Sequence, residues 1–118
     1  MTADGVHVPR KGDLVWLDLG EDVTGEVGKR RPVLVLSEIA FNREREVCIV
    51  APVSTSMRGY STEVDLPLNL AVQGAVMSEH VRTVNWRVRN ARPIGRVPAR
   101  VVEAVLNRLC VILGIEQK

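Results

Sequence analysis

Short apolar runs alternate with polar turn segments along most of the chain, and this pattern predicts β-strands. The runs are rich in Val, Ile and Leu and lie at residues 13–20, 31–38, 46–54, 63–68 and within 74–86. In the first run, Leu14 and Trp16 are expected on one face and Val15 and Leu17 on the other. The last run is expected to break near Ser78, and the basic segment 87–97 is read as a loop.

The C-terminal segment shows a different, helical period. Pro98 is expected at the first helical position and Gly114 at the stop, which predicts a helix over residues 98–113. One helix face carries an apolar stripe at Val102, Val105, Leu106, Leu109, Ile112 and Leu113. Several short strands followed by one helix predict a mainly β fold, a small antiparallel barrel or half-barrel with a helix packed on it.

Size and composition place the chain among single-domain globular proteins. It has 118 residues, 46% of them hydrophobic, and 16 basic against 14 acidic side chains. The first ten residues are polar and expected to be flexible. Cys48 and Cys110 lie in apolar runs, so they are expected to be buried thiols in a reducing compartment. Without a signal segment or a membrane-length apolar run, a cytoplasmic location is the expectation.

A cationic cluster directly precedes the second predicted strand. Lys29, Arg30 and Arg31 stand before Pro32, at the end of a polar segment that begins at Gly20. A basic triplet is commonly only a solvated surface. Here, however, the strand would fix the backbone of the last arginine, and a held guanidinium suits bidentate binding of a phosphate. Glu26 in the same segment is either a surface charge or a carboxylate that orients the arginine or accepts a proton.

Hydroxyl side chains end the third predicted strand. Ser54, Thr55 and Ser56 could simply satisfy turn backbone, or a strand-end hydroxyl could donate a hydrogen bond to a phosphoryl oxygen. Arg58 would extend the positive field along the same edge.

A third segment, "SEHVRTVNWRVRNAR", mixes cations with an aromatic side chain. Arg82, Arg87, Arg89 and Arg92 surround Trp86, as in a groove for single-stranded nucleic acid. The alternative, that Trp86 is a core or dimer-interface residue, is favoured because the chain has few aromatic residues. Neither histidine stands at a metal-ligand spacing with the cysteines, so no metal or other cofactor is expected. What remains for chemistry is arginine, carboxylate and hydroxyl.

In order along the chain, "KGDLVWLDL", "GEVGKRRPVLVLSE", "AFN", "CIVAPVSTSMRGY" and "VRTVNWRVRNARPIGRV" resemble the successive motifs of the MazF/PemK-type toxins. These are endoribonucleases of bacterial toxin–antitoxin systems, and the resemblance runs from about Lys11 to Gly114. It implies an SH3-like barrel with an appended helix, a homodimer, and metal-independent cleavage of single-stranded RNA at short specific sequences. It also implies neutralisation by a cognate MazE-like antitoxin whose acidic, disordered tail would fold on binding.

The resemblance assigns roles to particular residues. The family's main catalytic arginine corresponds to Arg31, and its strand-end threonine corresponds to Ser54, with Thr55 beside it. Serine keeps the hydroxyl donor but lacks the methyl group that restricts the rotamer. The loop glutamate corresponds to Glu26 and a further acidic residue to Glu79. The expected RNA-binding set is Lys29, Arg30, Thr55, Arg58, Glu79, Arg82 and Arg87.

Two other functions compete with RNA cleavage. One is a non-catalytic toxin of the same fold that binds DNA gyrase through its dimer surface and C-terminal helix. The other is an RNA-binding barrel without catalysis. The gyrase-binding toxin would not need an arginine–proline strand start together with a strand-end hydroxyl.

Overall fold

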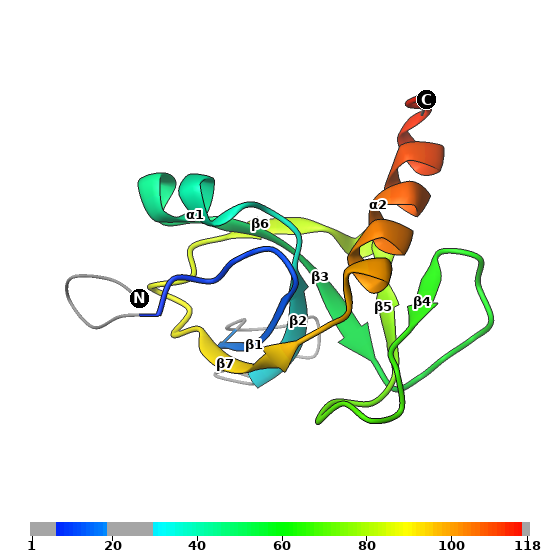
Figure 1. Ribbon diagram of the computed structural model, residues 1–118, viewed down its shortest axis with the longest axis horizontal. Coiled ribbons are helices and arrows are strands. Elements are labelled where there is room, and N and C mark those ends of the chain that lie inside the picture. The colour runs from blue at the N-terminus through cyan, green and yellow to red at the C-terminus, as the bar shows by residue number, and fades with distance from the viewer. Residues whose placement is uncertain (1–6, 19–29, 117–118) are drawn as a thin grey trace, which may run out of the picture.

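The computed structural model describes residues 7–18 and 30–116. Figure 1 shows an antiparallel sheet with helices at its margins. The elements are β1 (Asp13–Asp18), β2 (Arg30–Val35), α1 (Ile39–Arg45), β3 (Cys48–Ser54), β4 (Glu63–Asp65), β5 (Ala75–Met77), the short 3₁₀ helix η1 (Ser78–His80), β6 (Arg82–Val84), β7 (Arg92–Arg96) and α2 (Ala99–Leu113). The mainly β fold with a C-terminal helix is confirmed, and so is the break at Ser78.

Two elements differ from the sequence-based expectation. Segment 87–97, read as a loop, contains β7, whose residues Arg92–Arg96 pair with β1 across a register shift between Leu14 and Val15. Pro93 and Gly95 make this strand hard to recognise from sequence, because both residues are unusual in strand interiors. They are tolerated here because the pairing with β1 is irregular. The short helix α1 was not anticipated, since seven residues carry too little periodicity to be recognised.

The sheet follows the order β4-β5-β3-β2-β1-β7, and β6 pairs with β3 outside this path. One edge of β3 is shared between two partners: Cys48–Val50 pair with β6, and Val53 and Ser54 pair with β5. Helix η1 turns the chain between these partners. In the described part of the chain, no strand pairing joins the two ends of the path, so the expected barrel closure stays a prediction.

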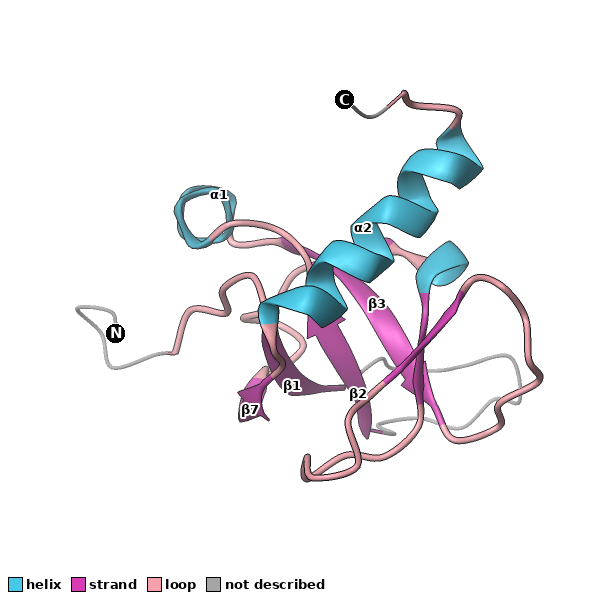
Figure 2. Cartoon of the chain, turned by 45° about the vertical axis from the view of Figure 1, so that its right-hand side comes forward, coloured by secondary structure: helices cyan, strands magenta, loops and turns pink. Residues whose placement is uncertain are grey.

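Both faces of the central strands are buried. In β2, Leu34 belongs to a cluster that α2 covers, whereas Val33 and Val35 belong to a second cluster on the opposite face. Figure 2 shows α2 lying across the first face. The second cluster includes Trp86, which is 1% exposed and donates its indole N–H to the carbonyl oxygen of Asn42. The core interpretation of Trp86 is therefore confirmed.

Helix α2 starts one residue later than expected. Pro98 is the N-cap residue, because its ψ of 149° is extended, while Gly114 ends the helix in the left-handed conformation as expected. Of the expected apolar stripe, Val102 and Val105 are buried, and Leu106 and Leu109 are half-buried against the same core cluster. At the other end of the expected stripe, Ile112 and Leu113 are exposed. The helix outruns the sheet that it packs on, and its last turns project beyond the strands (Figure 1).

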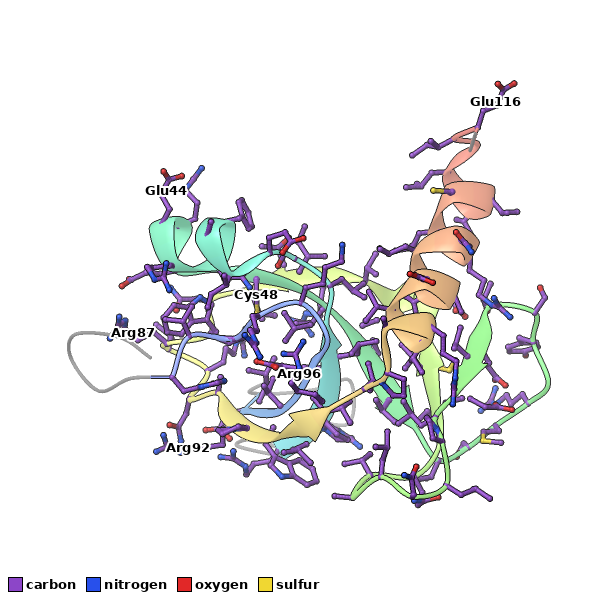
Figure 3. The ribbon with its side chains drawn as sticks, viewed as in Figure 1. Glu44, Cys48, Arg87, Arg92, Arg96 and Glu116 are labelled. Atoms are coloured by element: carbon purple, nitrogen blue, oxygen red, sulfur yellow. The ribbon has the colours of Figure 1, made fainter. Side chains whose placement is uncertain are left out.

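The N-terminal segment is ordered by packing where the structure describes it. Val8 and Pro9 are buried, which differs from the flexibility expected for the first ten residues. The buried carboxylate of Asp13 accepts hydrogen bonds from the Arg10 backbone N–H and the Arg96 guanidinium. Arg96 thereby links β7 to the start of β1, and Figure 3 shows its side chain directed toward the N-terminal segment.

The two cysteines lie in different environments and are both free thiols. Cys48 is buried as expected, and burial raises the pKa of its thiol to about 12. Cys110 is only half-buried, so the expectation of two buried thiols is wrong for this residue. It lies on α2 near the end that extends past the sheet.

Candidate active site

Arg31, Ser54 and Thr55 line one pocket of about 640 Å³. The complete lining comprises Trp16, Arg31, Pro32, Pro52, Val53, Ser54, Thr55, Ser56, Ala71, Val72, Gln73 and Met77. The cation and hydroxyls that the sequence placed on two separate motifs therefore share a site. A guanidinium and three hydroxyls on an otherwise largely apolar wall suit a phosphate group, because donors aimed at an anion act more strongly where water is partly excluded.

Strand pairing explains why these residues meet. Arg31 lies opposite Leu17 of β1 near the start of β2, and β2 pairs antiparallel with β3. The start of β2 and the end of β3 therefore lie at the same edge of the sheet, so Ser54 is brought beside Arg31. Two core strands hold the backbone under both groups, which keeps the donors in place before a substrate arrives.

A local hydrogen bond orients Ser54. The backbone N–H of Ser56 donates to the Ser54 Oγ atom over 3.0 Å, so the hydroxyl oxygen is anchored as an acceptor. Its own hydrogen stays available to donate to a phosphoryl oxygen. The ST-type turn thus supplies the orientation that serine loses by lacking the methyl group of threonine.

A glycine packs directly against the end of β3. Gly74 has a φ of +126°, and a Cβ atom added there would lie 2.3 Å from the carbonyl oxygen of Ser54. Only glycine allows this approach. The segment before β5 is therefore held against Ser54, and its residues Ala71–Gln73 complete the pocket wall.

Two arginines near the site have other contacts. The guanidinium of Arg30 bonds the carboxylate of Asp18 across the β1–β2 pair over 3.1 Å. Arg58 lies in an exposed turn, and its backbone N–H donates to the buried Glu63 carboxylate. Neither arginine lines the pocket of Arg31.

Two other predicted cations, Arg82 and Arg87, lie away from this pocket. Arg82 pairs with Val50, near the opposite end of β3 from Ser54. Arg87 lies 5.2 Å above the Trp86 ring and bonds Glu46 over 3.0 Å. Figure 3 places Arg87 on the side of the molecule opposite α2. Within one chain, the structure therefore does not bring Arg82 or Arg87 together with Arg31. Arg92 lies closer, because it pairs with Trp16 of β1, which lines the pocket.

Glu79 is an exposed carboxylate on η1 that favours its ionised form. Partial burial acts to raise its pKa, but hydrogen bonds from its own backbone amide and from Thr62, together with the charge of His80, lower the pKa overall. Because the pKa is lowered, the carboxylate stays charged at a pH lower than that at which an ordinary glutamate becomes protonated. Glu79 does not line the pocket of Arg31.

Two predicted residues, Glu26 and Lys29, lie outside the described residues. The structure adds others that sequence reasoning missed: Trp16, Gln73 and Met77 line the pocket, and Gly74 positions its wall. The only sequence signal for this wall was the isolated glycine before a strand.

Among residues 7–18 and 30–116, no group of three or more His, Cys, Asp or Glu side chains is arranged to hold a metal ion. The same residues include no helix of the length and hydropathy needed to cross a membrane.

Residues 10–113 match the family model described as "PemK-like, MazF-like toxin of type II toxin-antitoxin system". The chain belongs to this toxin family. The resemblance drawn from the motifs is thereby confirmed over nearly the whole sequence. This MazF-like chain is 30% identical over 108 residues to the endoribonuclease toxin MazF of Escherichia coli (strain K12), covering 92% of this chain and 96% of that protein. It is also 30% identical over 116 residues to the Escherichia coli endoribonuclease PemK, covering 90% and 86%.

Solved structures of MazF proteins share the fold. The MazE–MazF crystal structure (Form-II) from Deinococcus radiodurans superposes with a TM-score of 0.85 at 38% identity, covering 94% of this chain and all of that one (100%). MazF from the same organism (Form-I) gives 0.84 at 39% identity, with 92% and 99% coverage. A mycobacterial endoribonuclease in complex with its cognate antitoxin, at 21% identity, TM-score 0.77 and coverage of 93% and 99%, supports the fold alone. The antiparallel sheet with a C-terminal helix is thus the MazF architecture.

Proposed function

We propose that this MazF-like toxin is an endoribonuclease that cleaves single-stranded RNA at short specific sequences and thereby stops translation and growth. The observation that supports this most is that Arg31, Ser54 and Thr55 line one pocket in a member of a toxin family whose curated relatives are endoribonucleases. A cationic donor and two hydroxyls suit phosphoryl transfer, whose main requirement is stabilisation of developing negative charge.

The reaction is attack by the substrate's own 2′-hydroxyl on the adjacent phosphorus. The P–O5′ bond breaks, which leaves a 2′,3′-cyclic phosphate and a 5′-hydroxyl. Arg31 stabilises the doubly charged phosphorane and can serve the proton transfer to the leaving oxygen, while Ser54 donates to a phosphoryl oxygen. Glu26 is the candidate for the base or for orienting Arg31. Because the nucleophile belongs to the RNA, the mechanism needs no metal-activated water.

Incubating the purified protein with a long single-stranded RNA in the presence of EDTA tests this proposal. We expect discrete fragments that end in a cyclic phosphate, and these would distinguish the enzyme from both alternatives. RNA retained intact on the protein would instead favour the non-catalytic RNA-binding barrel. Neither cleavage nor binding would favour a toxin that acts on a protein such as gyrase.

The two neighbouring hydroxyls should differ in importance. Ser54→Ala is expected to lower the cleavage rate about tenfold, because a neutral donor contributes less than a guanidinium to a developing charge. Thr55→Ala is the matched control and should cost less, because only Ser54 is oriented by a backbone N–H. Single-turnover rates on one RNA measure both effects. A greater loss of cleavage rate in Thr55→Ala than in Ser54→Ala would show that Thr55, and not Ser54, supplies the catalytic hydroxyl.

We further propose that the working form is a homodimer of SH3-like barrels. The end of α2 and the residues that follow it expose apolar side chains that one chain leaves uncovered: Val111, Ile112, Leu113 and Ile115 are 80%, 46%, 66% and 55% exposed. A two-fold pairing, the commonest closed symmetry, would bury such a surface. Light scattering should give twice the mass of the chain, 13.1 kDa, at micromolar concentration; a monomer would exclude this assembly.

A dimer could also bring the separated cations into one RNA-binding groove. Arg58, Arg82 and Arg87 lie outside the pocket of Arg31 in one chain, and a groove that runs along two chains could combine them with Lys29, Arg30, Thr55 and Glu79. Phosphate contacts of this kind give affinity that falls with salt. The RNA-binding role of these residues rests on the family resemblance and, for those that the structure describes, on their exposed positions.

Control by an antitoxin is proposed on the same basis. The solved relatives include MazE–MazF complexes, and the basic exposed segments of this chain would attract an acidic tail that folds on binding. A cytoplasmic ribonuclease requires such an inhibitor. A peptide of the antitoxin's acidic tail should displace an uncleavable RNA, whereas a ternary complex in native mass spectrometry would contradict shared binding.

A further inference from the structure

A second pocket adjoins the pocket of Arg31 and has a different character. It encloses about 530 Å³ and is lined by Thr55, Met57, Asp65, Leu66, Pro67, Leu68, Gln73 and Gly74. Thr55 and Gln73 line both pockets, so the two lie side by side. A nucleic-acid chain with one phosphate at Arg31 can therefore place a neighbouring base in the second pocket.

The wall of this pocket is braced before any ligand binds. The backbone N–H of Leu66 donates to the carbonyl oxygen of Gly74 over 2.9 Å and closes the intervening loop at its base. Within the loop, the Gln73 amide nitrogen donates to the carbonyl oxygens of Leu68 and Leu70 over 2.9 and 2.8 Å. A braced loop loses little conformational entropy when a ligand binds, as a recognition site requires.

These hydrogen bonds determine which atom Gln73 can offer to a ligand. Both amide hydrogens point at carbonyl oxygens, so the side-chain oxygen, an acceptor, is the polar atom left for another partner. Asp65, exposed at the end of β4, adds a carboxylate, which accepts only. Met57 and Leu68 are 53% and 88% exposed and provide apolar surface for a planar ring. The pocket therefore combines apolar walls with two acceptor side chains, Asp65 and Gln73, and with the hydroxyl of Thr55.

Among the RNA bases, guanine matches this arrangement best. Its Watson–Crick edge presents neighbouring donors, N1–H and the N2 amino group, which one carboxylate can accept together. Cytosine and adenine place a ring acceptor beside their amino group, and uracil places its single N–H between two carbonyl oxygens. Each would direct a lone pair toward the carboxylate. Reading such edges in unstacked RNA is the usual basis of sequence specificity.

We propose that this second pocket is a guanine subsite next to the cleaved phosphate, with Asp65 and Gln73 as its specificity-determining residues. The proposal deepens the ribonuclease function and rests on it for the identity of the ligand. It makes guanine, at one fixed position beside the scissile bond, part of the recognised sequence.

The test measures binding, so that it does not depend on cleavage. The probes are uridine hexamers, 2′-deoxy throughout and therefore uncleavable, that carry one guanine or one hypoxanthine base. Hypoxanthine lacks only the N2 amino group. The wild-type protein should bind the guanine probe about tenfold more tightly, the scale of one good base contact. Equal affinities would overturn the proposal, whereas cleavage of ordinary RNA separately tests the ribonuclease function.

The Asp65→Asn variant tests whether the carboxylate of Asp65 is responsible for the preference for guanine over hypoxanthine. The amide keeps the size of the side chain but replaces one acceptor with a donor, so the tenfold ratio should fall to about twofold or less. Glu44→Gln is the control, because Glu44 is an exposed carboxylate on α1 and lies far from β4 (Figures 1 and 3). The ratio of guanine to hypoxanthine affinity in this variant should equal that of the wild-type protein. Circular dichroism checks the fold of each variant. A folded Asp65→Asn variant that retains the full ratio would overturn the assignment of Asp65.

Discussion

Arg31→Ala is expected to lower RNA cleavage by at least about 100-fold and to leave the fold intact. The rate loss follows because Arg31 is the cation that lines the phosphate pocket beside Ser54, and removing one positioned stabiliser of transition-state charge costs on this scale. The fold should survive because Arg31 is exposed at the start of β2, where its side chain is not part of either core cluster. Single-turnover kinetics with saturating protein measure the chemical step.

Arg30→Ala is a matched control for this effect. It removes the same charge from the adjacent residue, but Arg30 bonds Asp18 and does not line the pocket. Its rate at saturation should stay within about threefold of wild type, because an exposed ion pair contributes little to stability or geometry. An equal loss of cleavage rate in both variants would mean that the positive charge acts by general attraction of RNA, and not through a positioned guanidinium at Arg31. Near-normal cleavage by a folded Arg31→Ala variant would show that Arg31 has no catalytic role.

The sequence predicted the site best where strand periodicity fixed a residue's place. Arg31 precedes a continuous apolar run and Ser54 ends another, so each lies at a strand end whatever the details of the sheet. Antiparallel pairing of β2 and β3 then brings these ends together. The residues that no periodic run positioned, such as Arg82 and Arg87, lie elsewhere in the chain's own structure.

What the sequence could not predict depends on long-range contacts and irregular backbone. Strand β7 carries Pro93 and Gly95 and forms only because β1 offers a partner edge. Helix α2 displays a continuous apolar stripe, but periodicity cannot say where the supporting sheet ends, so the exposure of Leu113 was not foreseen. The wall beside Ser54 likewise comes from a loop whose path is determined by tertiary packing at Gly74.

Gly74→Ala should be the most destabilising single-methyl change near the site. The added Cβ would lie 2.3 Å from the Ser54 carbonyl oxygen, and a φ of +126° is strained for any other residue. Backbone strain and overpacking together predict a loss of about 3 kcal/mol or more in the free energy of unfolding. Where the variant folds, the end of β3 must shift, so cleavage should fall more than tenfold because the Ser54 hydroxyl leaves its position.

The Gly59→Ala variant separates the cost of backbone strain from the cost of overpacking. Gly59 also has a positive φ, +76°, but an added Cβ meets no atom within 4 Å, so only the conformational cost of about 1 kcal/mol applies. Urea unfolding of both variants measures the difference, and cleavage at a temperature where both are folded measures the displacement of Ser54. Equal destabilisation of the two variants would show that the contact with Ser54 relaxes freely. Strong destabilisation of Gly74→Ala with wild-type cleavage would show instead that the catalytic hydroxyl does not depend on this loop, and the position of Ser54 would then be determined by the pairing of β3 with β2 and β5.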